Sequence, residues 1–270
     1  MTRPAPRRLA AISGAALLVG LGIAFGCSTF SADTPPVTAT DGGDAGAPDA
    51  AIPSVCDHVD ASFCDDFEVL PLGAKWPMGA DLEGGTLTLV DGSVASPLYA
   101  LQASLLDNGL PSLPGTKGFA QLFRYQSRNV ALPVVVVDAD LKIDGLGGSK
   151  DGVVGLVSMG FDDNQSVLLV VGEQNGMVEG SVVTFGSAAD AGPSNVFVTL
   201  SALHTWFHVS IVIDLANAKL DFFVDGEQRV NGGVGIRNSG PQYLFGVGAF
   251  ATQPTGTNTV TIDNVVITAR

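Results

Sequence analysis

Histidine spacing is the first feature with chemical meaning in this 270-residue chain, which contains only three histidines. His204 and His208 are four positions apart, a spacing that lets two imidazoles share a metal ion on a helix. On an extended strand the same spacing separates them by about 13 Å, at ~3.3 Å per residue. His208 falls inside a predicted strand, so this pair is not expected to bind a metal.

Motifs of nucleophilic and phosphate chemistry are missing from the sequence. The segment Gly155-Leu-Val-Ser158-Met-Gly160 departs from the G-x-S-x-G elbow because its first glycine is misplaced. The chain has neither a glycine-rich phosphate loop with a lysine nor an H-E-x-x-H motif. The sequence therefore contains no recognisable catalytic motif, and the chain is not expected to be an enzyme.

The first 26 residues have the pattern of an export signal. Residues 1–8 carry three arginines and no acid, and residues 9–26 are uncharged and rich in Ala, Gly and Leu. A plain secreted form is one alternative, and a retained membrane span is another, because 18 apolar residues reach the lower limit for a span. The string from Ala24 to Cys27 resembles a bacterial lipobox, which implies cleavage before Cys27 and a lipid on that cysteine. Ser28, rather than Asp, then implies the outer membrane or cell surface.

The mature chain is strongly acidic and begins with a low-complexity segment. Cleavage leaves 270 − 26 = 244 residues with 10 basic and 27 acidic side chains, a net charge of −17. Such a charge excludes nucleic acid as an expected partner. Residues 27–55 are mostly Ala, Asp, Pro, Thr, Gly and Ser without an apolar period, which predicts a disordered tether with a reach of roughly 30 Å.

Two further cysteines open the predicted folded domain, residues 56–270. Cys56 and Cys64 are eight positions apart, and export places them where disulfides persist. The alternative is a metal site with His58 and an Asp, which would need a fourth ligand from elsewhere. A disulfide between Cys56 and Cys64 is the prediction.

Apolar and polar residues alternate along most of this domain. Residues 134–144 place Val135, Val137, Ala139, Leu141 and Ile143 on one face and acids and Lys142 on the other. Further strands are predicted at 85–90, 118–126, 153–160, 167–172, 177–185, 196–200, 206–215, 219–224, 242–250 and 257–268, and 99–106 is compatible with a strand or a helix. About a dozen strands without crossover helices predict an all-β fold, an antiparallel two-sheet sandwich.

Three segments resemble a known family. The string Trp206-Phe207-His208-Val209, followed by residues 222–226 (FFVDG), resembles the W-x-H-V and Y-V-D-G signature of laminin-G-like and concanavalin A-like jelly rolls. Residues 63–68 resemble the opening strand of such domains, and residues 261–265 resemble the closing strand. The resemblance implies a jelly roll in which Trp206 and His208 are structural.

The resemblance also implies a structural calcium ion where the first and last strands meet. Glu68 and Asp263 stand at the matching positions, and carboxylates suit this ion. Ordinary strand-end acids are the alternative. The apolar residues change phase between Ile262 and Val265, which predicts a bulge at Asp263-Asn264 that redirects a side chain.

Two kinds of carbohydrate chemistry can be tested on the sequence. Glucanases of this fold carry a strand resembling E-x-D-x-x-E, and none of the five glutamates has that spacing, although distant aspartates could still form a pair. Sugar stacking requires exposed aromatic rings. Phe119, Phe123 and Tyr125 share one side of their strand and Tyr243 is another candidate, with core packing as the alternative.

These observations lead to one main hypothesis and two alternatives. The main hypothesis is a cell-envelope lipoprotein that displays a non-catalytic binding or adhesion domain for carbohydrate or a surface protein. The first alternative is a polysaccharide-cleaving enzyme of the concanavalin A-like fold, favoured by a pair of facing carboxylates. The second is a purely structural envelope protein.

Overall fold

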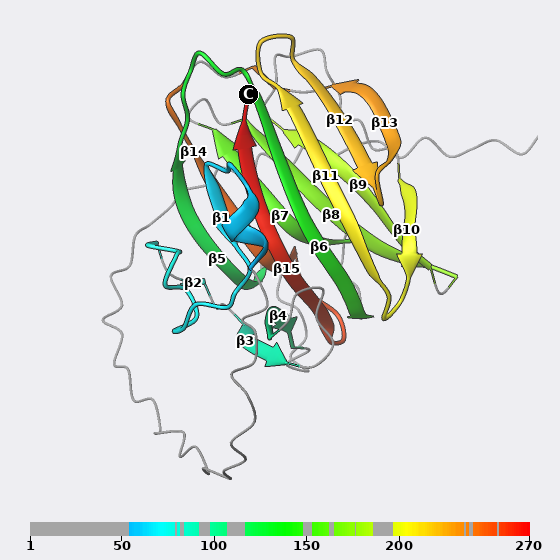
Figure 1. Ribbon diagram of the computed structural model, residues 1–270. Helices are drawn as coiled ribbons and strands as arrows, with labels where there is room; N and C mark the ends of the chain where they lie inside the picture. The colour runs from blue at the N-terminus through cyan, green and yellow to red at the C-terminus, as the bar shows by residue number, and fades with distance from the viewer. Residues whose placement is uncertain are drawn as a thin grey trace, which may run out of the picture. The chain divides into compact units, whose positions relative to one another are not determined.

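The computed structural model describes most of the chain from residue 54 onward (Figure 1). The described ranges are 54–78, 80–81, 84–91, 98–106, 117–147, 153–161, 165–175, 177–185, 197–234, 236–237, 240–252 and 254–270. The chain divides into Met1–Pro48 and Asp49–Arg270. The predicted signal, Cys27 and nearly all of the tether lie outside the described residues. Within the described ranges, no helix has the length and apolarity needed to cross a membrane.

The described residues form two antiparallel sheets, which confirms the predicted all-β sandwich. The larger sheet has the order β13 (Glu227–Val234), β12 (Lys219–Val224), β11 (Trp206–Asp214), β6 (Val134–Leu146), β15 (Asn258–Ala269), β4 (Tyr99–Leu105) and β3 (Gly85–Asp91), and β1 (Phe63–Asp65) also pairs with β15. The second sheet has the order β10 (Val198–Ala202), β9 (Met177–Phe185), β8 (Ser166–Gln174), β7 (Val154–Phe161), β14 (Gln242–Thr252), β5 (Lys117–Ser127) and β2 (Ala80–Asp81). Figure 1 shows the eight-stranded sheet in front of the seven-stranded sheet.

The core lies between the two sheets and follows the alternation in the sequence. On β6 the five predicted inward residues are all buried, and on β11 the inward set Phe207, Val209, Ile211 and Ile213 is buried as well. Trp76 is the largest fully buried side chain and packs against Phe63 and Phe245. Because successive side chains of a strand point to opposite faces, the residues between these positions form the outer faces of the sandwich.

The last strand changes partner halfway along its length. Ile262 on β15 pairs with Leu101 of β4, whereas Val265 pairs with Asp65 of β1. Between these points the register with β6 shifts and Asn264 adopts a φ of 49°, a left-handed conformation that Asn tolerates better than most residues. This confirms the predicted bulge at Asp263-Asn264 and the predicted pairing of the first and last strands (Figure 1).

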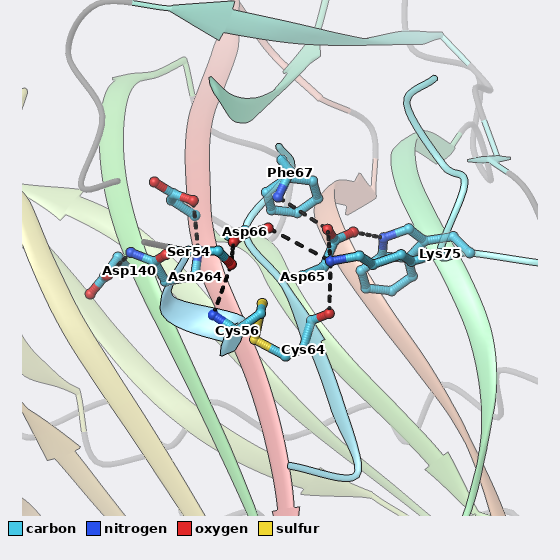
Figure 2. Close-up of a disulfide and its surroundings, with 11 residues drawn as sticks. Ser54, Cys56, Cys64, Asp65, Asp66, Phe67, Lys75, Asp140 and Asn264 are labelled. Carbon is cyan, nitrogen blue, oxygen red and sulfur yellow. Dashed lines mark hydrogen bonds and ion pairs between the residues drawn. A yellow bond between two sulfur atoms is a disulfide. The ribbon is translucent and has the colours of Figure 1, made fainter. Parts of the chain in front are cut away.

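The predicted disulfide joins the short 3₁₀ helix η1 (Val55–His58) to β1. Cys56 and Cys64 are bonded with a Cα–Cα distance of 5.5 Å. Ser54 caps η1 by accepting from the backbone N–H of Cys56 at 3.0 Å and donates its hydroxyl hydrogen to Asp66 (Figure 2). The disulfide and this hydrogen bond fix the start of the domain to the strand that pairs with β15.

Two buried acids in this region share one cation. Lys75 Nζ lies 3.3 Å from Asp65 and 3.6 Å from Asp66, and Trp76 Nε1 donates to Asp65 at 2.6 Å. Burial raises the pKa of Asp66, but the hydrogen bond from Ser54 and the charge of Lys75 outweigh it and lower the pKa. Both carboxylates are therefore neutralised within the fold.

Tyr99–Leu105, compatible with either structure in the sequence, is the strand β4. Two elements differ from the sequence-based expectations. No strand is predicted between residues 224 and 242, yet Glu227–Val234 form β13, which pairs with β12 through two register shifts. The two-residue strand β2 was not expected, because so short a segment has no alternation to detect.

Candidate functional site

A cluster of titratable side chains lies on the outer face of the eight-stranded sheet. Asp138 and Asp140 alternate with the buried residues of β6 and so point away from the core. His208 on β11 is the direct pairing partner of Asp140, and Asn264 projects from the bulge on the opposite side of β6. Asp138, Asp140, His208 and Asn264 are called the acid–base cluster below.

The four side chains form a continuous chain of polar contacts. Asn264 Nδ2 donates to Asp140 Oδ2 at 2.7 Å, the contact drawn in Figure 2. Asp140 Oδ1 lies 2.8 Å from His208 Nδ1, and His208 Nε2 faces Asp138 Oδ1 at 3.6 Å. Asp140 is thus held by Asn264 and orients the imidazole, whereas the contact of Nε2 with Asp138 is looser.

The two carboxylates keep the imidazole charged. Asp138 and Asp140 raise the pKa of His208 from 6.5 to about 10 by hydrogen bonding and by their charges, against the opposing effect of partial burial. At neutral pH both ring nitrogens therefore carry protons. The side chain of His208 is 43% exposed, so the cluster is open to a ligand.

The backbone beside His208 is fixed by the turn between β12 and β13. The backbone N–H of His208 donates to Asp225 Oδ1 at 2.9 Å, and the N–H of Asp225 donates to the His208 carbonyl at 2.9 Å. Asp225 and Gly226 both have positive φ, as the tight turn requires. This pair of hydrogen bonds holds β11 in register with the turn.

Trp206 lies two residues from His208 on the same outer face. It pairs with Lys142, whose Nζ lies 5.6 Å from the centre of the indole ring. Lys142 also forms an ion pair with Asp144 at 3.3 Å, and Asp144 accepts from Thr261 at 2.8 Å. A half-buried aromatic ring and a row of polar groups therefore lie next to the acid–base cluster.

The cluster has the groups for proton transfer but not the geometry for a metal ion. A protonated imidazole stands beside a carboxylate and is oriented by a second carboxylate. The two carboxylates approach opposite nitrogens of the ring, so they do not converge on one point. Consistently, the described part of the chain has no group of three or more His, Cys, Asp or Glu side chains that could hold a metal ion.

His204 and His208 do not act together. His204 has positive φ, lies at the turn before β11 and approaches Asp144 at 3.5 Å. The two histidines therefore contact different acids. This agrees with the separation of the two imidazoles expected on an extended strand.

The two acids of the calcium prediction have structural partners. Glu68 Oε1 accepts from the backbone N–H groups of Leu98 and Tyr99, both at 3.0 Å, where β4 begins. Asp263 is completely buried and accepts from the N–H of Asn264 at 2.8 Å. The described residues around them do not supply a set of metal ligands. Calcium binding at these two residues stays a prediction.

The four aromatic residues considered for sugar stacking divide into two groups. Tyr243 is buried and packs against Phe161 in the core, and burial raises the pKa of its hydroxyl. Phe119, Phe123 and Tyr125 lie on the outer face of the seven-stranded sheet and are not part of the core. Core packing therefore accounts for the position of Tyr243 but not for the positions of the other three aromatic residues.

The sequence analysis considered His208 only as a metal ligand, which it rejected, and as a structural residue, and it did not identify the partners of His208. The alternation of residues 134–144 places Asp138 and Asp140 on the outer face, which is the signal that could have drawn attention to them. The pairing of β6 with both β11 and β15 is a tertiary property, so the sequence did not reveal that His208 and Asn264 flank Asp140.

Comparisons with known proteins return structures but no sequence family. No family model matches the chain, and no curated protein matches it. Among solved structures, the alginate lyase AlgAT5 of polysaccharide lyase family 7 is 15% identical, with 63% of this chain and 78% of that chain covered and a TM-score of 0.44. The family 7 alginate lyase AlyA1 from Zobellia galactanivorans is 10% identical, with 70% and 96% covered and a TM-score of 0.45. The cellulose-induced protein Cip1 is 18% identical, with 76% and 96% covered and a TM-score of 0.46.

The fold is the antiparallel two-sheet sandwich that the sequence predicted. The comparisons contradict the expectation that the chain is not an enzyme, since several of the similar structures are alginate lyases. That expectation relied on the absence of familiar motifs. In a β-sandwich, groups that act together can also come from different strands, and such groups leave no local motif.

Proposed function

We propose that this chain is a polysaccharide-cleaving protein of the cell envelope, anchored by a lipid on Cys27, and that the acid–base cluster performs the cleavage. The observation that carries the proposal is the exposed imidazole of His208 between the carboxylates of Asp138 and Asp140. The two carboxylates lie on one strand and flank the imidazole, and this combination of acid and base groups supports the catalytic alternative over a pure binding domain.

Each member of the cluster has a role in breaking a glycosidic bond. His208 Nε2, the more loosely held of the two ring nitrogens, donates its proton to the leaving glycosidic oxygen as the C–O bond breaks. A water molecule bonds through its oxygen to the anomeric carbon and releases a proton to solvent, because Asp138, 3.6 Å from Nε2, lies on the same side of the linkage as the acid. His208 then takes up a proton from solvent, which the charge of Asp138 holds on Nε2, and the starting state is restored. Asp140, held by Asn264, orients the ring throughout.

Trp206 is placed to bind the neighbouring sugar. Trp206 and His208 are two positions apart on one face of a strand, roughly 7 Å along its axis. A sugar ring stacked on the indole would therefore bring its next linkage close to His208.

The charge of this face favours hydrolysis of an uncharged polymer. Asp138, Asp140, Asp144 and Asp225 outnumber His208 and Lys142 around the site. A polymer of acidic sugars would be repelled by this excess of negative charge. Cleavage by elimination needs such an acidic sugar, so hydrolysis is the proposed reaction.

The experiment is a cleavage assay with the full-length chain. Hydroxyethyl cellulose, β-1,3-glucan, galactomannan and alginate are each incubated with it, and new reducing ends and absorbance at 235 nm are followed. We expect new reducing ends without ultraviolet absorbance, and a loss of about 100-fold or more in His208→Gln and Asp138→Asn. Val212→Thr, on the outer face of the same strand, is the matched control and should keep full activity. The proposal is refuted if no polymer is cleaved, if both variants cleave like wild type, or if the product absorbs at 235 nm.

A further inference from the structure

A second face of the molecule has chemistry that the acid–base cluster does not use. On β5, Phe119, Gln121 and Phe123 alternate with the buried residues Ala120 and Leu122, and so lie on the outer face of the seven-stranded sheet. Phe250 of β14 is the pairing partner of Phe119. Phe119, Gln121, Phe123 and Phe250 are called the aromatic face below.

The rings of this face lie against the backbone of neighbouring strands. A Cβ atom on Gly155 of β7 would lie only 2.0 Å from Cζ of Phe250, and one on Gly246 of β14 would lie 2.6 Å from Cε1 of Phe123. Side chains at these two positions would displace the rings. The glycines therefore leave room for both rings to pack directly against the neighbouring strands.

The arrangement extends across two strands. The rings of Phe119 and Phe250 have centroids 6.5 Å apart and are inclined by only 15°. Both side chains are partly exposed rather than buried in the core. Together they form a pair of nearly parallel apolar rings, against which the apolar face of a sugar ring can stack.

A buried amide lies between the two aromatic residues of β5. Gln121 is only 2% exposed, and its Nε2 has no hydrogen-bond partner. Leaving such a donor unpaired is unfavourable unless another molecule provides an acceptor. A sugar hydroxyl oxygen would provide one, at a position between two stacking rings.

The charge of this face restricts the ligand. From Phe119 to Tyr125 on the outer side of β5, and along the outer side of β14, the described side chains carry no charge. An acidic polymer would find no counter-charge among these residues, whereas an uncharged sugar needs only stacking and amide contacts.

From these observations we infer that the aromatic face is a binding site for an uncharged polysaccharide, separate from the acid–base cluster on the other sheet. Phe119, Phe123 and Phe250 stack against sugar rings, and Gln121 donates a hydrogen bond to a hydroxyl oxygen. The site goes beyond the proposed cleavage, because it would hold a polymer whether or not the chain cuts it.

Affinity electrophoresis tests this inference. The full-length chain is run in gels containing hydroxyethyl cellulose, β-1,3-glucan, galactomannan or alginate. We expect at least one uncharged polymer to retard the wild type and alginate not to do so. Phe123→Ala and Gln121→Leu should each weaken retardation by about tenfold in apparent Kd, the size expected for one stacking or hydrogen-bonding contact.

Gln121→Leu separates a binding role from a structural one. It removes an unpaired buried amide, so the melting temperature should stay the same or rise while binding falls. Phe223→Ala, which removes a ring from the eight-stranded sheet, is the matched control and should bind like wild type, as should His208→Gln. The inference is overturned if no uncharged polymer retards the chain, if Gln121→Leu binds like wild type, or if His208→Gln abolishes binding. The last result would place binding at the acid–base cluster. Retardation of the wild type by an uncharged polymer that the wild type does not cleave would refute only the proposed function.

Discussion

Replacing His208 with Gln should remove a pH dependence of stability that the acid–base cluster produces. The folded-state pKa of about 10 lies above the ordinary value of 6.5. Proton binding therefore stabilises the folded state fully below pH 6.5, and this stabilisation is lost as the pH rises through about 10. Gln has no such titration, so the difference between the two proteins should shrink with increasing pH.

The size of the effect follows from the exposure of the ring. If the ring were shielded from water, a rise in pKa from 6.5 to about 10 would correspond to a stabilisation of the folded state by about 5 kcal/mol. This uses ~1.4 kcal/mol for each pKa unit. The side chain of His208 is 43% exposed, and solvent screening reduces exposed ion pairs to roughly 1 kcal/mol or less. We therefore expect the proton on His208 to contribute about 1 kcal/mol to the free energy of unfolding.

Urea unfolding at pH 6, 8 and 10.5 provides the measurement. The advantage of wild type over His208→Gln in free energy of unfolding should be about 1 kcal/mol larger at pH 6 than at pH 10.5. Lys and Tyr titrate in both proteins, so their contributions cancel in the difference. A difference that is constant across this range would refute the reasoning, because it would mean that the carboxylates do not hold a proton on His208.

Three further predictions concern the disulfide, the lipid anchor on Cys27 and the calcium site. Replacing Cys56 and Cys64 together by Ser should lower the free energy of unfolding by about 2–3 kcal/mol, as expected for a closed loop of this length; unchanged urea midpoints would contradict the bond. Cys27→Ala should release the chain from the membrane fraction on cell fractionation, and an unaltered distribution would rule out a lipid anchor there. If calcium binds near Glu68 and Asp263, added Ca²⁺ should raise the melting temperature and a chelator should lower it; no response and no ion by elemental analysis would exclude the site.

The strands could be predicted from the sequence because each strand buries only one face, so apolar and polar residues alternate along it. Residues 134–144 and 206–214 alternate without a break, and both are strands in the structure. The strand β13 was not predicted, because Gly232 and Gly233 interrupt the alternation of its side chains, and only pairing with β12 makes the segment a strand. The bulge at Asp263-Asn264 was found because a change of apolar phase is itself a local signal.

The candidate sites were less predictable, because they depend on register and on rings lying across strands. Asp140 and His208 are 68 residues apart in sequence, and only the pairing of β6 with β11 brings them together. Phe123 was recognised as a candidate, but its support by Gly246 could not be read from either residue alone.

The disulfide at the start of the domain also has a mechanical consequence. A force that pulls on the chain before Ser54 reaches Cys56 first, and the disulfide passes it directly to Cys64 in β1. The residues between the two cysteines cannot straighten, so roughly 25 Å of extension is withheld from the pulled chain. The load instead falls on the hydrogen bonds between β1 and β15. The domain should therefore respond to tension as a stiff body until β1 separates from β15, rather than by gradual lengthening at its N-terminal end.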